Sequence, residues 1–164
     1  MFKIAGSIMV VVAAFLIGFF MRKELKDACD FTIDMIDGLN ALKEEIRYNS
    51  DYILNSISKS AMLSGSAKPF FDKVYSEIKE GNSAEQAFSE ASLEIKNENV
   101  RSVIFNMSKM IGKTDAVGQQ NLLSGCIEKL VILHEQQSSL LKERGNLYPK
   151  LGAVSGILIT ILLF

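Results

Sequence analysis

The chain begins and ends with uncharged apolar segments, which constrain its fold more than any other feature of the sequence. Eighteen residues from Ile4 to Met21 carry no charge, and a helix of that length reaches roughly 27 Å, close to the hydrocarbon thickness of a bilayer. Fourteen uncharged residues from Leu151 to Phe164 reach about 21 Å, and a start at Leu147 adds about 6 Å with Lys150 extending toward the interface. We therefore expect a transmembrane helix at each end.

A cleaved signal peptide is the alternative for the first segment, because Lys3 supplies a positive start. Against this alternative, the residues from Gly18 to Met21 contain no small-x-small cleavage site, and Arg22 and Lys23 follow directly. We interpret the segment as a retained membrane anchor.

Basic residues flank both segments on the side of the central region, and only Lys3 lies on the far side. The flanking residues are Arg22, Lys23, Lys26, Lys142, Arg144 and Lys150. The positive-inside rule then predicts a location in the cell membrane, with the central domain in the cytoplasm and both termini outside.

The central region carries 17 basic and 19 acidic residues once Lys3 is set aside from the 18 basic residues of the chain. This slightly negative balance gives no support for nucleic-acid binding. The two cysteines, Cys29 and Cys126, are expected to be reduced thiols that serve as small hydrophobic residues in a cytoplasmic domain.

Apolar residues recur at steps of three and four through the central region, which predicts helices and no strands. The predicted fold is all-α, with a six-helix cytoplasmic bundle between two transmembrane helices. The expected parts are residues 1–22 as an anchor, 23–148 as the bundle and 149–164 as the second span. Their helices cover about 23–48, 51–63, 68–80, 84–95, 100–111 and 115–148.

Several residues mark the expected helix ends. Ser83 and Gln86 have the spacing of a capping box. Gly112 is expected to end one helix and Thr114 to cap the next as structural residues, with Asp115 in its first turn. Pro149 should kink the chain or begin the tail helix anew.

Gly112-Lys113-Thr114 is similar to the end of a phosphate-binding loop. That motif requires a further glycine five positions earlier, where this chain has Met107, and it requires a preceding strand. A helix is predicted there instead, so we expect a turn between helices and no nucleotide site.

Catalytic chemistry has no support in the sequence. His134 is the only histidine, and together with Cys126 it supplies two ligands, fewer than a zinc site requires. No histidine base accompanies a serine or cysteine nucleophile at a recognisable spacing. We therefore expect no enzyme activity, no cofactor, no metal and no small-molecule substrate.

Gly152 and Gly156 are four residues apart in the second apolar segment, a spacing that lets another helix approach closely. The predicted contact is a small residue of the first segment, in the same chain or in another copy. The candidates are Gly6, Ser7, Ala13, Ala14 and Gly18.

The chain resembles the stage III sporulation protein AB family over nearly its whole length. The residues that carry the resemblance are Leu42, Glu45-Ile46-x-Tyr48, Gly81-x-Ser83 with Phe88, Ile111-Gly112-x-Thr114-Asp115 followed by Gln119, and Leu151-Gly152 with Gly156. Two positions depart from the family pattern. Ser50-Asp51-Tyr52-Ile53 stands where the family tends to have Thr-Pro-Leu, and Phe88 stands where tryptophan is usual.

The resemblance implies a bundle similar to the cytoplasmic domains of type II secretion and type IV pilus platform proteins. It implies a scaffold for a channel between mother cell and forespore, located in the mother-cell membrane. The implied partners are a secretion-type ATPase, other channel membrane proteins, the lipid bilayer and, in addition, a second copy of the domain. Carried over by position, the docking candidates are Glu45, Tyr48, Asp115 and Gln119.

A membrane-anchored adaptor or signalling bundle without a secretion role is the alternative, since the same architecture would serve it. A neighbouring gene for a secretion ATPase would favour the platform, and a neighbouring kinase or receptor gene would favour the adaptor. A pore-forming protein is disfavoured because neither apolar segment has a polar stripe to line water.

Overall fold

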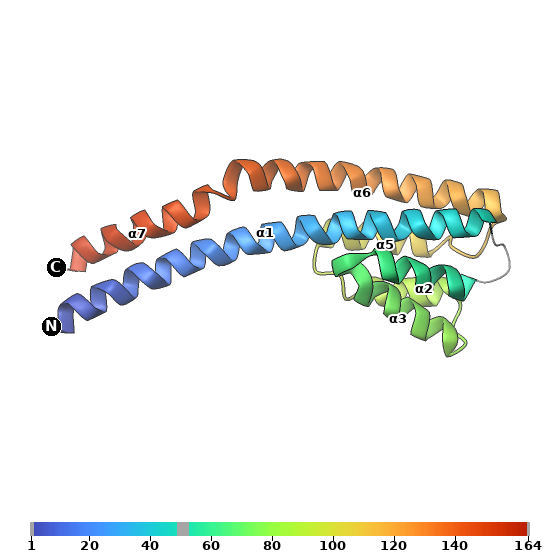
Figure 1. Ribbon diagram of the computed structural model, residues 1–164, viewed down its shortest axis with the longest axis horizontal. Helices are drawn as coiled ribbons and strands as arrows, with labels where there is room; N and C mark the ends of the chain where they lie inside the picture. The colour runs from blue at the N-terminus through green and yellow to red at the C-terminus, as the bar shows by residue number, and fades with distance from the viewer. Residues whose placement is uncertain (1, 49–52, 164) are drawn as a thin grey trace. The chain divides into compact units, whose positions relative to one another are not determined.

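The computed structural model describes residues 2–48 and 53–163, which form α-helices, one short 3-10 helix and the turns between them (Figure 1). The prediction of an all-α chain is confirmed for these ranges. The elements are α1 (Phe2–Tyr48), α2 (Ile53–Leu63), η1 (Gly65–Ala67), α3 (Lys68–Lys79), α4 (Ala84–Ser92), α5 (Glu98–Ser108), α6 (Ala116–Arg144) and α7 (Leu147–Leu163).

The chain divides into two compact units, and α1 and α6 contribute residues to both. The terminal unit consists of Met1–Cys29 and Gln136–Phe164, and the central unit consists of Asp30–Glu135. In the part of the chain that the structure describes, the central unit holds six α-helical segments besides η1, from the second part of α1 to the first part of α6. The predicted number of six helices is confirmed.

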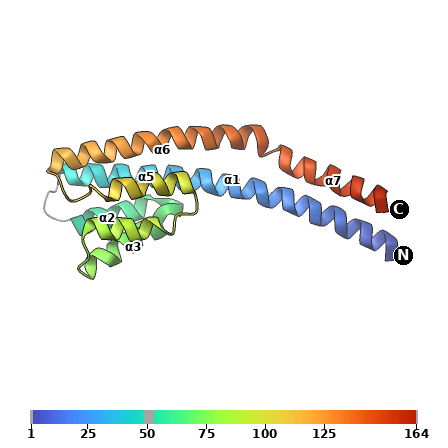
Figure 2. The ribbon, with the colours of Figure 1, turned by 180° about the vertical axis from the view of Figure 1, so that it is seen from behind.

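The core of the central unit draws apolar side chains from all six helical segments. Neighbouring helices pack in succession, α2 on α3, α3 on α4 and α4 on α5 (Figures 1 and 2). Side chains with no exposed surface include Leu39, Ile57, Phe71, Phe88, Ile104 and Leu123. Burial of each such side chain contributes about 1.5–3 kcal/mol, so this shared core is what holds the short helices in place.

An aromatic cluster joins α3 to α4 inside this core. The ring of Phe70 lies 5.1 Å from that of Phe71 and 5.8 Å from that of Phe88, both in edge-to-face arrangements. Phe88 is the position at which the family resemblance leads one to expect tryptophan, and here the smaller ring is fully enclosed.

The expected capping box at the start of α4 is confirmed. Ser83 Oγ accepts from the backbone N–H of Gln86, and the backbone N–H of Ser83 donates to Gln86 Oε1, both at 3.2 Å. Two otherwise unpaired N–H groups are thereby satisfied, which stabilises the short helix by about 1 kcal/mol.

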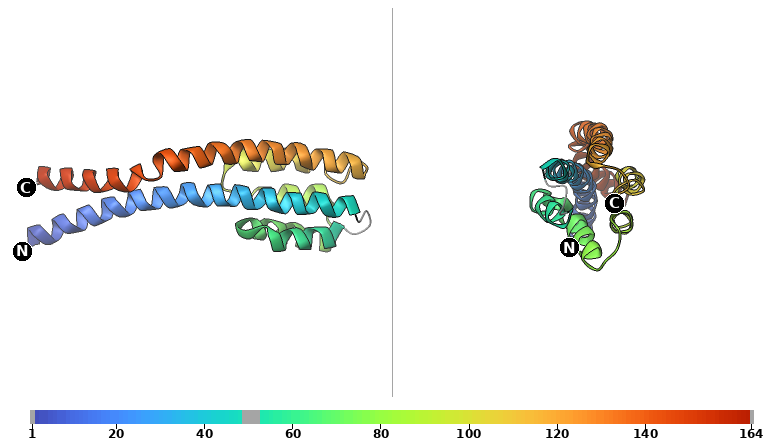
Figure 3. Two further views of the ribbon diagram at one scale, coloured as in Figure 1. Left: turned by 45° about the horizontal axis from the view of Figure 1, so that its top comes forward. Right: turned by 90° about the vertical axis from the view of Figure 1, so that its right-hand side faces the viewer.

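In the terminal unit, α7 runs beside the first part of α1 (Figures 1 and 3). The chain breaks its helix at Gly145 and Asn146, ahead of Pro149, which lies in the first turn of α7 where its missing N–H is tolerated. The interruption predicted near Pro149 therefore takes the form of a new helix that begins at Leu147.

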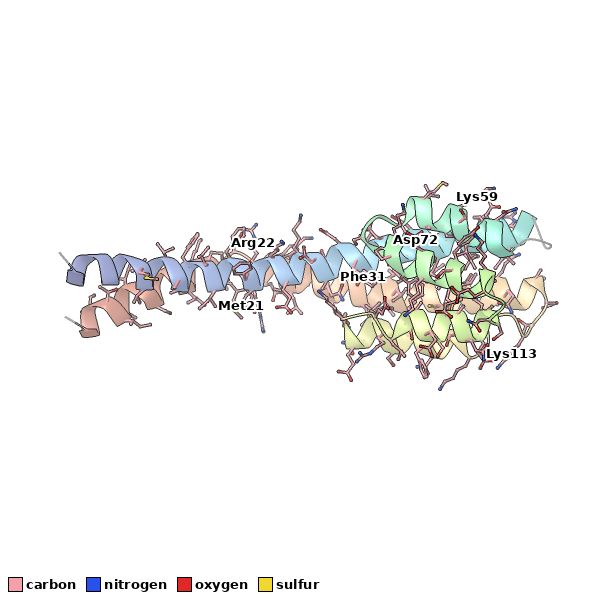
Figure 4. The ribbon with its side chains drawn as sticks, turned by 90° about the horizontal axis from the view of Figure 1, so that it is seen from below. Met21, Arg22, Phe31, Lys59, Asp72 and Lys113 are labelled. Carbon is pink, nitrogen blue, oxygen red and sulfur yellow. The ribbon has the colours of Figure 1, made fainter. Side chains whose placement is uncertain are left out.

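The prediction of flanking transmembrane helices is wrong: within residues 2–48 and 53–163, no helix is both long enough and apolar enough to cross a membrane. α7 has 17 residues, which extend about 26 Å, and it includes Lys150 in its first turn. The first apolar segment is not a separate helix, because α1 continues past Met21 into Arg22 without interruption (Figure 4).

Candidate docking and helix-contact surfaces

The connection between α5 and α6 is longer than the sequence predicted, because α5 ends before the expected stop at Gly112. α5 ends at Ser108, and the chain turns through Ile111, whose side chain is buried, before α6 begins at Ala116. Gly112 lies in the left-handed region with φ 77°, a conformation that costs about 1–2 kcal/mol for a residue with a Cβ. The glycine at this position is thus required by the backbone of the turn.

The residue that caps α6 is Asp115 and not Thr114. Asp115 Oδ1 accepts from the backbone N–H of Gly118 at 2.9 Å, and α6 begins at the next residue, Ala116. A carboxylate at this place is also favoured by the helix dipole. Thr114 has a different role, since its Oγ1 accepts from Gln119 Nε2 at 2.9 Å.

Gln119, a predicted docking residue, faces the interior of the central unit. Its side chain is 7% exposed and follows the same stripe of α6 as Leu123, Cys126 and Leu130. Its position one helical turn before Leu123 is a sequence signal that points to burial. In this structure the Gln119 side chain donates to Thr114 in the preceding turn and is too buried to contact a partner.

An ion pair that the sequence did not reveal ties this turn to the start of α4. Lys113 Nζ lies 2.7 Å from Glu85 Oε2, and a Cβ at Gly112 would lie 3.5 Å from that of Ala84. Because the Lys113 and Glu85 side chains are 53% and 40% exposed, the pair stabilises by at most about 1 kcal/mol. Its main consequence is geometric, since it joins the α5–α6 turn to the first turn of α4.

Glu45, another predicted docking residue, pairs with α2. Its Oε1 lies 2.8 Å from Lys59 Nζ, with Glu45 23% and Lys59 58% exposed. Tyr48 is the last residue of α1, and its side chain falls outside the part that the structure describes. α1 ends and α6 begins at the same end of the central unit (Figures 1 and 2).

The structure places α7 directly against α1 at both glycines of the predicted helix contact. A Cβ at Gly152 would overlap the carbonyl oxygen of Ala14, and one at Gly156 would come within 2.9 Å of Val11 Cα. Gly18 is the third glycine of this contact, since a Cβ there would lie 2.7 Å from the carbonyl carbon of Tyr148. A Cβ at Gly6, by contrast, would meet no atom within 4 Å.

Cys126 is a core residue of α6, and its thiol is buried. Burial raises the pKa of this thiol from 9.0 to about 12, despite the opposing charge of Lys129, so it is protonated at neutral pH. Across the described ranges, no three His, Cys, Asp or Glu side chains are grouped so that they could hold a metal ion.

Comparison with known proteins identifies the family. The family model for stage III sporulation protein AB matches residues 3–164. Comparisons with curated proteins and with solved structures gave no match. Since the matched residues include nearly the whole chain, both the central and the terminal unit fall within the family pattern. The chain belongs to the stage III sporulation protein AB family.

Proposed function

We propose that this sporulation protein is a non-enzymatic platform that connects a cytoplasmic secretion-type ATPase to the other parts of a channel between mother cell and forespore. In this proposal the central unit receives the ATPase, and the terminal unit contacts the remaining channel components.

The observation that carries the proposal is the braced polar surface at one end of the central unit, the α5–α6 turn with the start of α4. The left-handed Gly112 and the Asp115 cap define the backbone of the turn, and the Lys113–Glu85 pair adds a weak link to α4. A surface that is already ordered loses less conformational entropy on binding than a mobile one does. Such a surface suits a platform that receives force from its partner. We therefore assign the ATPase contact to this end, with exposed Asp115 at its centre, and include Glu45 from the last turn of α1, which pairs with Lys59 of α2.

The terminal unit supports the second half of the proposal, because many of its large apolar side chains remain exposed. Examples are Met9, Ile17, Phe20, Leu151, Leu158 and Ile161. Extensive exposed apolar surface is typical of contacts with membranes or with other proteins. We propose that this unit associates with the channel's membrane proteins and with lipid at the mother-cell membrane.

A pull-down of the secretion ATPase tests the docking surface. We expect Asp115→Lys to reduce capture by at least tenfold, because it reverses the charge at the centre of the surface. Asp115→Asn removes the charge and keeps the helix cap, because asparagine is an equally good N-cap residue. This variant therefore separates the effect of the charge from that of the cap. Glu128→Lys makes the same charge change on an exposed position of α6 away from the turn and should leave capture unchanged.

The proposed surface is wrong if Asp115→Lys, shown by circular dichroism to remain folded, captures the ATPase as well as the wild type does. It is also wrong if Glu128→Lys reduces capture to the same extent, because the effect would then follow net charge alone.

A further inference from the structure

We draw no further inference here: the strongest candidate, the exposed face of α6 around Gly125, where an added Cβ would meet no atom within 4 Å and Val117 and Ile132 lie open, carries none because nothing in the structure shows what covers it.

Discussion

Two glycines inside helices of the central unit have opposite surroundings. At Gly38 in α1, an added Cβ would lie 2.6 Å from Phe71 Cζ and 2.9 Å from Ser64 Cβ. At Gly125 in α6, it would meet nothing within 4 Å. Gly38 is therefore explained by the close packing of α1 on the α2–α3 region, whereas no contact within the described residues explains Gly125.

We expect Gly38→Ala to lower the free energy of unfolding by about 1–3 kcal/mol, because overlap with the Phe71 ring outweighs the gain in helix propensity. Gly125→Ala is the matched control and should raise it by about 0.5–1 kcal/mol. Urea unfolding of both variants measures the difference. A Gly38→Ala protein that is more stable than the wild type would show that α1 does not pack closely on Phe71.

Burial of the Cys126 thiol predicts a specific loss of stability in alkali. Its pKa is raised from 9.0 to about 12, so above pH 9 the unfolded chain releases a proton that the folded chain keeps. The free energy of unfolding should fall as pH rises through this window, with a slope of at most about 1.4 kcal/mol per pH unit from this group.

Cys126→Ala removes that component, so unfolding curves for wild type and variant should converge between pH 9 and pH 12. Other groups titrate in the same range, which makes the difference between the two proteins the quantity to measure. Parallel stability curves over this range would contradict burial of the thiol.

At the scale of helices, the sequence predicted which helices exist more accurately than the residues at which each helix begins and ends. Amphipathic spacing was sufficient to place the central helices and the capping box at Ser83. Spacing left open whether α1 is one helix or two, because the apolar part and the charged part each favour a helix by themselves. Nor could it separate Thr114 from Asp115 as a cap, because both residue types suit that position and only the hydrogen bond to Gly118 decides.

The contact between α7 and α1 depends on the absence of side chains at Gly152 and Gly156. We expect Gly152→Leu with Gly156→Leu to separate the helices, because leucine atoms would occupy the space now held by the backbone at Ala14 and Val11. The consequences should be faster proteolysis at the α6–α7 connection, residues 145–146, and loss of co-purification with other channel components.

Ser155→Leu provides the matched control, because it adds the same side chain at an exposed position between the two glycines. If the double variant resists protease and assembles as the Ser155→Leu protein does, close approach at the glycines is not needed for this unit.

At the scale of the whole molecule, the candidate sites were predicted in part. The resemblance located docking candidates near the end of α1 and the start of α6, and the figures place both helix ends at one end of the central unit (Figures 1 and 2). The Lys113–Glu85 brace joins residues far apart in sequence, so no local pattern reveals it. Gln119 was carried over from the family resemblance as a docking candidate, although its place on the stripe of Leu123 turns it inward.

The most direct test of the platform proposal is photo-crosslinking in sporulating cells from a photoreactive residue at Met110 in the α5–α6 turn, with an equivalent residue at Met62 on α2 as the control. Both methionines are well exposed, so the two probes differ mainly in location, and neither removes the Lys113–Glu85 pair. Mass spectrometry should identify the secretion-type ATPase among proteins captured from position 110 and not from position 62. Absence of the ATPase at position 110, or equal capture from both positions, would contradict docking at this end of the central unit.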